Sequence, residues 1–331
     1  MTGPPRAITL ASPAKINLFL EIVGRRPDGY HTISTVFQEI SLSDTLRARI
    51  ASTDRLTLAT VTRGLKADGT NLVLRAARAF RERFPRTPGL SFSLKKRIPL
   101  GAGLGGGSSN AANALRAAWA LSPTRLAEPT GSPVPDDPQI PFKILHPLAA
   151  SLGADVPFFL RGGLASAGGV GDRLTFYSPV ARRRYAFVLV FPRVFSSTPV
   201  AYRALHFPLT KRRFRLRLTQ ALKDGAPATL WSPWIFNRLE EAVLPRLRPV
   251  RQAKDALRQA GCLNAMMSGS GASVFGVVTD AAHGRRVIQK IRREAWDVWL
   301  VSSVSRFENS GSSFNRMEHH GNHGNPSFAP R

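Results

Sequence analysis

The chain is poor in cysteine and has no long hydrophobic run. Its only cysteine, Cys262, cannot form a disulfide within the chain. This composition favours a reducing compartment, so we expect a cytoplasmic protein, although a secreted protein without disulfides has the same count. No segment approaches the roughly 20 apolar residues of a membrane span. Lys15 and Asn17 interrupt the apolar stretch near the N-terminus, so neither a signal peptide nor a membrane partner is predicted.

Acidic residues are also scarce. The 331 residues include 21 acidic and 47 basic ones, which gives a formal net charge of +26. Such a charge attracts polyanions, and it leaves nucleic acid, anionic lipid and phosphorylated small molecules open as partners. The arginines are spread along the whole chain, however, and dispersed arginine is typical of a solvated surface. A nucleic-acid-binding protein is therefore an alternative rather than the preferred interpretation.

The length and the 43% hydrophobic content predict a globular protein of two lobes, because a single hydrophobic core usually stops growing at roughly 250–300 residues. Turn residues at 27–29 between two apolar segments predict a strand hairpin within residues 5–50. Further strands are expected at 90–94, 158–160, 163–167 and 185–191, with a strand pair at 263–278. Helices are expected at 71–84, 110–121, 148–152, 236–260 and 281–295.

Two segments lack any such periodicity. Residues 122–147 are rich in Pro, Asp and Thr, and we interpret them as a loop insertion. Residues 307–331 are rich in Asn, Gly, Ser and His, which predicts a disordered tail. The tail carries His319, His320 and His323, but its composition favours disorder over a metal site.

A glycine-rich segment precedes the alanine-rich helix predicted at 110–121. Glycines occupy positions 101, 103, 105, 106 and 107, directly before Ser108 and Ser109. Glycine lets the backbone approach a ligand closely, and the free amides at a helix N-terminus favour an anion. The two hydroxyls can cap the helix, or reach a phosphate or its magnesium ion. The segment therefore predicts a phosphate site.

Three known classes of phosphate loop can be compared with this segment. A Walker A loop needs a lysine before its Ser or Thr, whereas here Gly107 is followed directly by Ser108. A protein kinase needs His-Arg-Asp and Asp-Phe-Gly strings, and neither occurs. Gly101, Gly103 and Gly106 do match a dinucleotide fingerprint, yet the acidic residue expected about 20 positions later falls at Glu128 without a preceding strand. A nicotinamide-dependent dehydrogenase stays open as an alternative.

Three separated motifs resemble those of the GHMP kinases, a family of small-molecule kinases that includes galactokinase, homoserine kinase, mevalonate kinase and phosphomevalonate kinase. They are PAKIN at residues 13–17, the loop at residues 99–109, and MSGSGA at residues 267–272. Their order and spacing agree with the family. The strings GYH at 29–31 and GADVPFF at 153–159 add to the resemblance, which covers about residues 10 to 305.

The resemblance implies an α+β fold with two lobes. The N-terminal lobe, residues 1–180 with the insertion at 122–147, is expected to be of the ribosomal-protein-S5-like type. The C-terminal lobe, residues 181–306, is expected to combine antiparallel strands with helices. The active site is expected between the lobes, where two-domain enzymes commonly bind ligands. The sequence carries no signal for an oligomeric state.

The resemblance also implies an ATP-dependent phosphotransferase. Its acceptor is expected to be a hydroxyl of a cytidine-diphosphate-linked methylerythritol in the non-mevalonate isoprenoid route, with the acceptor of another GHMP kinase as the alternative. Asp155 is expected to be the general base, and Lys15 to hold that carboxylate and offset charge on the phosphoryl oxygens. ATP is expected to contact Asn71, Lys96, Pro99, Leu100, Gly101, Ala102, Gly103, Leu104, Gly105, Gly106, Gly107, Ser108 and Ser109, with Lys95 as an alternative to Lys96.

The remaining expectations concern the acceptor and the metal ion. By resemblance, Tyr30 and Tyr202 stack on the cytosine, while His31 and Asn17 hydrogen-bond polar groups of the acceptor. A kinase of this kind needs Mg2+, and Ser108, with Ser109 as the alternative, is the expected hydroxyl ligand.

Overall fold

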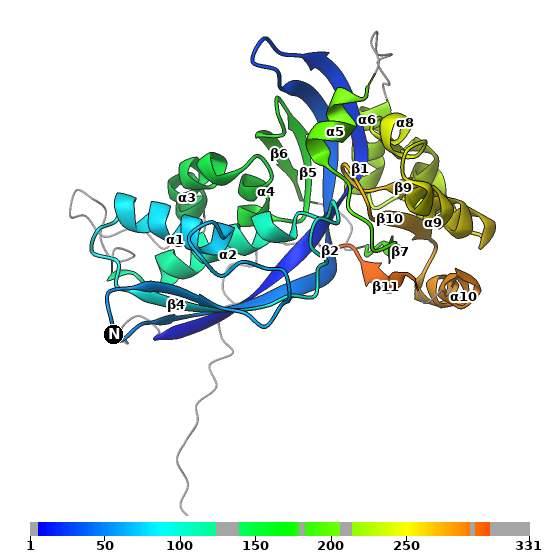
Figure 1. Ribbon diagram of the computed structural model, residues 1–331. Helices are drawn as coiled ribbons and strands as arrows, with labels where there is room; N and C mark the ends of the chain where they lie inside the picture. The colour runs from blue at the N-terminus through cyan, green and yellow to red at the C-terminus, as the bar shows by residue number, and fades with distance from the viewer. Residues whose placement is uncertain (1–5, 124–138, 179–182, 206–213, 292–294, 305–331) are drawn as a thin grey trace, which may run out of the picture.

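Two long N-terminal strands form the centre of the molecule. The computed structural model describes residues 6–123, 139–178, 183–205, 214–291 and 295–304. Strands β1 (Ala7–Arg25) and β2 (His31–Ile50) pair antiparallel, as the hairpin prediction required. Gly29 has a φ of +83°, and the carboxylate of Asp28 accepts a hydrogen bond from the Tyr30 amide, so the turn uses the residues that the sequence indicated. Figure 1 shows this hairpin crossing the whole molecule.

The hairpin belongs to a seven-stranded sheet with the strand order β3-β4-β2-β1-β8, from which β5 branches off by pairing with β2 and β6. The other strands of this sheet are β3 (Leu56–Ala59), β4 (Leu90–Lys95), β5 (Leu164–Gly168), β6 (Arg173–Tyr177) and β8 (Phe236–Asn237). The two-residue strand β8 comes from far along the chain and pairs parallel with β1. The sheet therefore includes a segment of the expected C-terminal lobe, and the boundary at residue 180 stays a prediction.

Four helices lie beside this sheet in Figure 1: α1 (Leu72–Arg83), α2 (Gly106–Leu121), α3 (Gln139–Leu152) and α4 (Val156–Arg161). Helix α2 packs against α1, α4 and strand β1, and nearly all of its residues are buried. Its many alanines fit this position, because small side chains let neighbouring elements approach closely. Residues from α1, α2 and β4, among them Phe80, Leu115 and Phe92, share one hydrophobic core.

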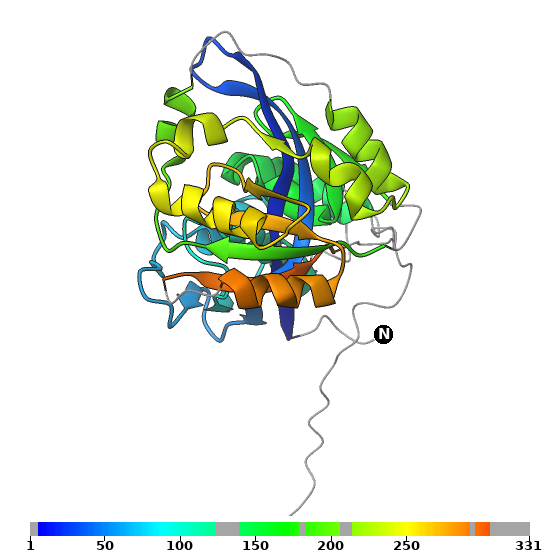
Figure 2. The ribbon, with the colours of Figure 1, turned by 90° about the vertical axis from the view of Figure 1, so that its right-hand side faces the viewer.

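A second sheet has the order β11-β7-β10-β9, with β7 (Ala186–Phe191), β9 (Asn264–Met267), β10 (Val274–Val278) and β11 (Asp297–Ser302). Ile16 of the first sheet shares a core with Phe187 and Phe275 of the second. Helices α9 (Arg248–Gln259) and α10 (Ala281–Ile291) pack on the second sheet, as Figure 2 shows. The shorter elements are α5 (Thr198–Arg203), α6 (Phe214–Lys223), α7 (Ala228–Trp231), η2 (Ser232–Trp234) and α8 (Glu240–Val243).

The α+β class is confirmed, and several predicted elements are confirmed with it: the helix at 71–84, the strands at 90–94, 163–167 and 185–191, and the pair at 263–278. The strand predicted at 158–160 is wrong, because this segment is part of helix α4. A short buried apolar run does not distinguish a strand from a helix, and Pro157 in the first turn with Gly162 at the C-cap delimits a helix here.

The single helix predicted at 236–260 is also wrong. Strand β8, helix α8 and helix α9 divide this segment, with Pro245 between the two helices and Pro249 in the first turn of α9. Two helices are longer than expected: α2 begins at Gly106 rather than at 110, and α3 begins at Gln139, within the expected insertion. Helix α10 ends at Ile291. Residues 124–138 and the tail 307–331 lie outside the described residues.

Among the described residues, none of the helices has the length and apolar character needed to cross a lipid bilayer.

Candidate active site

The glycine-rich loop connects strand β4 to helix α2. Gly101, Gly103 and Gly105 have φ angles of +65°, +75° and +69°, a region that side chains other than glycine rarely adopt. Gly105 is the N-cap residue of α2 and supplies no capping side chain, and the first turn holds no acidic residue. The amide groups at this helix N-terminus therefore face an environment suited to an anion.

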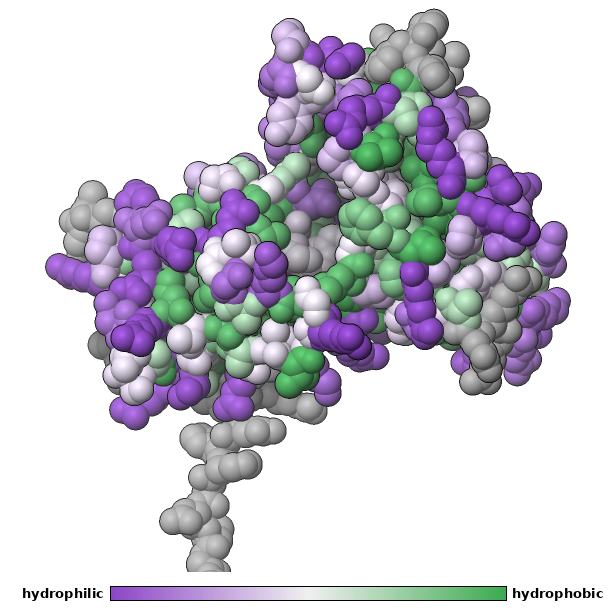
Figure 3. Space-filling model, viewed as in Figure 1, coloured by the Kyte–Doolittle hydropathy of each residue, from purple (hydrophilic) through white to green (hydrophobic). Residues whose placement is uncertain are grey.

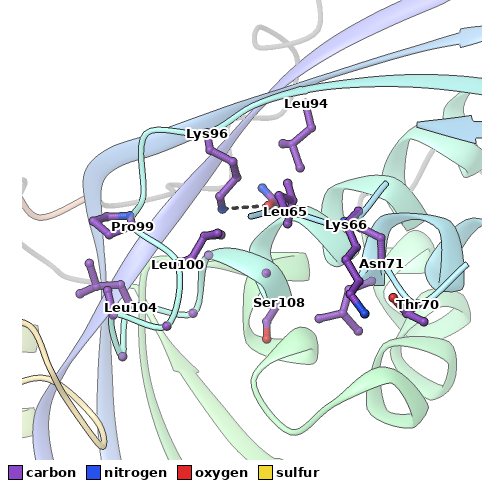
Figure 4. Close-up of a pocket in the computed structure, with 18 residues that line it drawn as sticks. Leu65, Lys66, Thr70, Asn71, Leu94, Lys96, Pro99, Leu100, Leu104 and Ser108 are labelled. Carbon is purple, nitrogen blue, oxygen red and sulfur yellow. Dashed lines mark hydrogen bonds between the residues drawn. The ribbon is translucent and has the colours of Figure 1, made fainter. Parts of the chain in front are cut away.

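A cavity of about 420 Å³ lies along this loop. In Figure 4, Pro99, Leu100 and Leu104 lie on one side, and Lys66, Thr70 and Asn71 on the other. The lining residues are Leu65, Lys66, Thr70, Asn71, Leu72, Leu94, Lys96, Pro99, Leu100, Gly101, Ala102, Gly103, Leu104, Gly105, Gly106, Gly107, Ser108 and Asn110. All the residues expected to contact ATP are in this set except Ser109, whose buried hydroxyl has no hydrogen-bond partner within the described part of the chain.

Lys96 is held in the cavity by buried polar groups. Its Nζ pairs with the Asp44 carboxylate and lies 3.1 Å from Asn110 Oδ1. Asp44 also accepts hydrogen bonds from the backbone amides of Arg97 (2.7 Å) and Ile98 (2.9 Å), so it fixes the chain just before the glycine loop. Lys95 is exposed and does not line the cavity, whereas Lys96 does.

Asn71 shapes the opposite side of the cavity. Its Oδ1 accepts a hydrogen bond from the Val73 amide (2.9 Å) and so caps helix α1. Its Nδ2 donates to the Lys66 carbonyl oxygen (2.7 Å). The side chain therefore fixes the segment 66–71 against the start of α1.

Lys15 and Asp155 meet outside the cavity lining, next to the same loop. Lys15 Nζ lies 3.6 Å from Asp155 Oδ2 and donates a 2.7 Å hydrogen bond to Asn17 Oδ1. The Lys15 amide donates to the Leu104 carbonyl oxygen (3.0 Å), which ties strand β1 to the loop. The Lys15 side chain is 6% exposed and that of Asp155 35% exposed. A buried cation thus lies beside a carboxylate that solvent and a ligand can still reach.

The third motif of the resemblance, residues 267–272, forms a second glycine loop that packs directly on the first. Ser268 Oγ donates to the Gly103 carbonyl oxygen (3.2 Å), and the Ser273 amide donates to the Ala102 carbonyl oxygen (3.1 Å). A Cβ on Gly103 would lie 2.5 Å from the Ser268 carbonyl oxygen, so only glycine fits between the loops. Asn237 holds the second loop by donating to the carbonyl oxygens of Met267 and Gly269, each at 2.8 Å.

The predicted acceptor residues are brought together only in part. The rings of His31 and Tyr202 lie 5.1 Å apart, centroid to centroid. Tyr30 is 67% exposed at the hairpin turn. Asn17 is buried, and its Nδ2 donates to Thr35 Oγ1 (2.9 Å) while its Oδ1 accepts from Lys15. The contacts of Asn17 therefore orient Lys15.

The surroundings of His31 and Tyr202 keep both rings uncharged at neutral pH. Burial, with the nearby Asp155 carboxylate, raises the pKa of Tyr202 to about 12. Burial, with the charge of Arg25, lowers the pKa of His31 below its ordinary value of 6.5. A neutral imidazole has one donor and one acceptor nitrogen, and the Tyr202 hydroxyl can donate. This combination suits a polar heterocycle.

Figure 3, viewed as Figure 1, shows a hollow in the middle of the molecular surface, with hydrophobic residues along its walls and hydrophilic residues around its rim.

Asp44 and Asn237 are parts of the site that the sequence reasoning missed. Each acts on residues at least 30 positions away in the chain, and no local motif identifies such a contact.

The sequence matches two profiles of one family: the GHMP kinases N terminal domain at residues 71–163 and the GHMP kinases C terminal at residues 225–298. A 4-diphosphocytidyl-2-C-methyl-D-erythritol kinase of Chlorobium luteolum is 38% identical over 290 residues, which cover 86% of this chain and 94% of the relative. The kinase of that name from Acaryochloris marina is 34% identical over 321 residues, which cover 92% of this chain and 98% of the relative.

Solved structures agree with these matches. The crystal structure of a 4-(cytidine 5'-diphospho)-2C-methyl-D-erythritol kinase has a TM-score of 0.72 at 33% identity, and covers 89% of this chain and 99% of its own. A homoserine kinase from Cytophaga hutchinsonii has a TM-score of 0.69 at 20% identity, covers 92% of this chain and 96% of its own, and supports the fold. The resemblance seen in three motifs is confirmed: the chain belongs to the GHMP kinase family of ATP-dependent phosphotransferases.

Proposed function

We propose that this kinase transfers the γ-phosphate of ATP to the 2-hydroxyl of 4-diphosphocytidyl-2-C-methyl-D-erythritol, a reaction of the non-mevalonate route to isoprenoid precursors. Relatives named for this activity at 34–38% identity over most of the chain support it. The observation in the structure that carries the proposal is the Lys15–Asp155 pair, which lies next to the glycine loop but outside the nucleotide cavity. A base in that position can serve a hydroxyl that approaches the γ-phosphate from beyond the loop.

Asp155 accepts the proton of the acceptor hydroxyl while the hydroxyl oxygen forms a bond to the γ-phosphorus and the bond to the ADP oxygen breaks. Lys15 orients the carboxylate and stabilises charge on the phosphoryl oxygens. The 3.6 Å separation of Lys15 Nζ and Asp155 Oδ2 supports these roles, because the two groups attract each other without forming a tight hydrogen bond. The carboxylate thus retains acceptor capacity for the hydroxyl.

ATP occupies the cavity along the glycine loop, with its phosphates at the N-terminus of α2 and its adenine side near Asn71 and Lys96. Support comes from the lining of the cavity and from the positive φ angles of the loop glycines. Asp44 and Asn110 hold the Lys96 ammonium in place. Because an ammonium only donates hydrogen bonds, Lys96 recognises acceptor atoms on the nucleotide.

Tyr30 and Tyr202 stack on the cytosine, and His31 hydrogen-bonds its polar edge. The 5.1 Å approach of His31 and Tyr202 and the neutral state of both rings support this assignment. The 67% exposure of Tyr30 leaves its ring available to a ligand. Asn17 acts at the acceptor site through its hydrogen bond to Lys15.

Mg2+ accompanies ATP, and Ser108 is the proposed hydroxyl ligand. Among the described residues, no cluster of three or more His, Cys, Asp or Glu side chains could hold a metal ion. Helix α2 offers two hydroxyls near its start: Ser108, in the cavity lining, and Ser109, which has no hydrogen-bond partner among the described residues. This donor set fits an ion that is held mainly by ATP phosphates, where it supplies positive charge against the phosphate oxygens.

The proposal is tested by measuring ADP release from Mg-ATP with the cytidyl methylerythritol acceptor, with mevalonate, with homoserine and without an acceptor. We expect turnover with the cytidyl compound alone. Turnover with another of these acceptors would support a small-molecule kinase but contradict the proposed cytosine site. Absence of turnover with all of them, together with tight and strongly salt-dependent RNA binding, would favour the nucleic-acid alternative raised by the net charge.

A further inference from the structure

The segment that follows strand β7 runs past both glycine loops. We call residues 193–198 the strap. Its side chains contact the loop at residues 99–105 and the loop at residues 267–272, which are far apart in the chain. None of the strap residues lines the nucleotide cavity or belongs to the residues expected to bind either substrate.

Phe195 contacts the first loop. A Cβ built on Gly101 would lie 2.9 Å from Phe195 Cδ2 and 3.0 Å from Cε2, so the ring occupies the space beside the glycine backbone. Gly101 itself lines the nucleotide cavity, whereas Phe195 does not. The ring therefore supports the loop without lining the cavity. Phe195 is 72% exposed, so it adds little to the hydrophobic core, and its contact with the loop is what distinguishes it.

Ser196 contacts the second loop. Its Oγ donates a 2.5 Å hydrogen bond to the Ser270 carbonyl oxygen, and the residue is buried. Two residues further on, Thr198 Oγ1 lies 2.7 Å from Ser270 Oγ. The second loop in turn approaches the reacting groups: a Cβ on Gly269 would lie 3.5 Å from Lys15 Nζ. The position of this loop therefore affects the environment of Lys15.

The strap is fixed at both ends. Arg193, at its start, donates hydrogen bonds of 3.1 Å and 2.6 Å to Asp297 of strand β11. Arg193 also has a φ of +53°, which is rare for a residue other than glycine and turns the chain toward the loops. At its other end, the strap enters helix α5, which carries Tyr202. A segment held in this way can transmit a fixed position to the two loops.

We propose that Phe195 and Ser196 are positioning residues for phosphoryl transfer. These neighbouring side chains of one strap hold the two glycine loops in a fixed position relative to each other. Phe195 fixes the loop that forms the nucleotide cavity, so its loss affects nucleotide binding. Ser196 fixes the loop beside Lys15, so its loss affects turnover. The role of Phe195 in nucleotide binding rests on the ATP chemistry of the family. Only the role of Ser196 in turnover rests on the proposed acceptor.

The test uses the full chain and ADP as the probe. In Phe195→Ala we expect the dissociation constant of ADP, measured by titration calorimetry without acceptor, to rise about three- to tenfold because the loop loses its support. Phe195→Leu, which keeps an apolar side chain over Gly101, should stay within about twofold of the wild type. In Ser196→Ala we expect kcat to fall about three- to tenfold while the ADP constant changes less than about twofold.

Leu230→Ala is the matched control. Leu230 is also an exposed large apolar residue, at 52%, but it lies on α7, which packs against α6 and η2. An unchanged ADP constant in Phe195→Ala, or an equal loss in Leu230→Ala, would overturn the role of Phe195. Equal effects of Ser196→Ala on the ADP constant and on kcat would overturn the division between the two residues.

ADP binding needs no acceptor, so this result is independent of the proposed substrate. If the wild-type chain binds ADP but does not phosphorylate the cytidyl acceptor, the proposed function fails. The Phe195 experiment still decides whether the strap supports the nucleotide-binding loop. The Ser196 experiment then uses whichever acceptor supports turnover in the acceptor comparison described above.

Discussion

Asp155 is the N-cap residue of helix α4, yet its carboxylate makes no capping hydrogen bond. Its side chain is partly exposed, and Lys15 Nζ lies 3.6 Å from Oδ2. An N-cap carboxylate normally stabilises its helix by accepting from the first amides. Here that contribution is missing, so the carboxylate is free of a capping role, and its proposed role as base is separate from the stability of the fold.

We therefore expect Asp155→Asn to lower kcat by about 10²- to 10⁴-fold, because an amide cannot accept the proton. The melting temperature and the dissociation constant of ADP should stay close to those of the wild type. Steady-state kinetics, calorimetry and thermal unfolding measure the three quantities. Asp224→Asn, a change of an exposed carboxylate that accepts hydrogen bonds from Gln220, is the control and should keep full turnover. A kcat within tenfold of the wild type would remove Asp155 from the role of base.

The lowered pKa of His31 predicts a pH dependence of acceptor binding. The ring is neutral at pH 7 and becomes charged only as the pH falls below the ordinary value of 6.5. We expect KM for the acceptor to be nearly constant from pH 7 to 8 and to rise only at pH values below 6.5, where the ring gains its proton. KM for ATP should show no such rise, and His31→Gln should abolish it. A rise of both KM values together would argue against His31 at the acceptor site.

The same lowered pKa affects stability with a definite sign. The folded chain holds the His31 proton less tightly than the unfolded chain, whose histidine has the ordinary pKa. Between the two values the unfolded chain binds more protons, so the free energy of unfolding decreases as the pH falls through this window. The effect fades as the pH rises above 6.5, where neither state binds the proton.

At the scale of elements, the two glycine loops behave as one unit because their backbones are in direct contact and leave no room for a side chain at Gly103. A Cβ at Gly103 would lie 2.5 Å from the Ser268 carbonyl oxygen and 2.6 Å from the Gly271 carbonyl oxygen. Both neighbours are backbone atoms and cannot rotate away. The positive φ of Gly103 adds a conformational cost for any other residue.

Gly103→Ala should therefore separate the loops and weaken ADP binding by at least about tenfold, with a lower melting temperature. Gly168→Ala is the matched control, because Gly168 lies at the end of β5, has no positive φ, and leaves open space within 4 Å of an added Cβ. Calorimetry with ADP and thermal unfolding compare the two variants. Equal ADP affinity in both would show that the contact between the loops does not shape the cavity.

The elements also show what the sequence could predict. The hairpin and the place of the glycine loop before a helix follow from local turn chemistry and helix-start signals, and both are confirmed, although α2 begins at Gly106 rather than at 110. The strand prediction fails at helix α4 because its buried residues, such as Phe158 and Phe159, carry no periodicity. The contacts of Asp44 with Lys96 and of Asn237 with Gly269 join distant segments, and a single sequence contains no signal for them.

At the scale of the whole molecule, a buried ion pair joins the first strand to the C-terminal half of the chain. Arg238, directly after β8, donates to Glu21 of β1 at 2.7 Å and 2.9 Å, and both side chains are at most 5% exposed. The pair anchors the neighbourhood of Asn237, which holds the second glycine loop. Removal of one partner would leave the other charge buried without compensation.

We expect Arg238→Ala to lower the free energy of unfolding by about 3–5 kcal/mol, measured by denaturant titration. Arg81→Ala is the control: Arg81 pairs with Asp54, which is 76% exposed, and its loss should cost less than about 1 kcal/mol. Similar losses in the two variants would show that burial does not govern the contribution of these pairs.

Strand β8 has a consequence for the order in which the chain acquires its structure during synthesis. In the described part of the chain, Phe236 and Asn237 pair with Phe19 and Leu20 on the β1 edge of the first sheet, more than 200 residues later in the chain. A ribosome must therefore complete most of the chain before this edge closes. Until then the growing polypeptide presents β1 as an open edge, the kind that pairs with other chains. A segment that emerges late thus closes part of the edge of the earliest one.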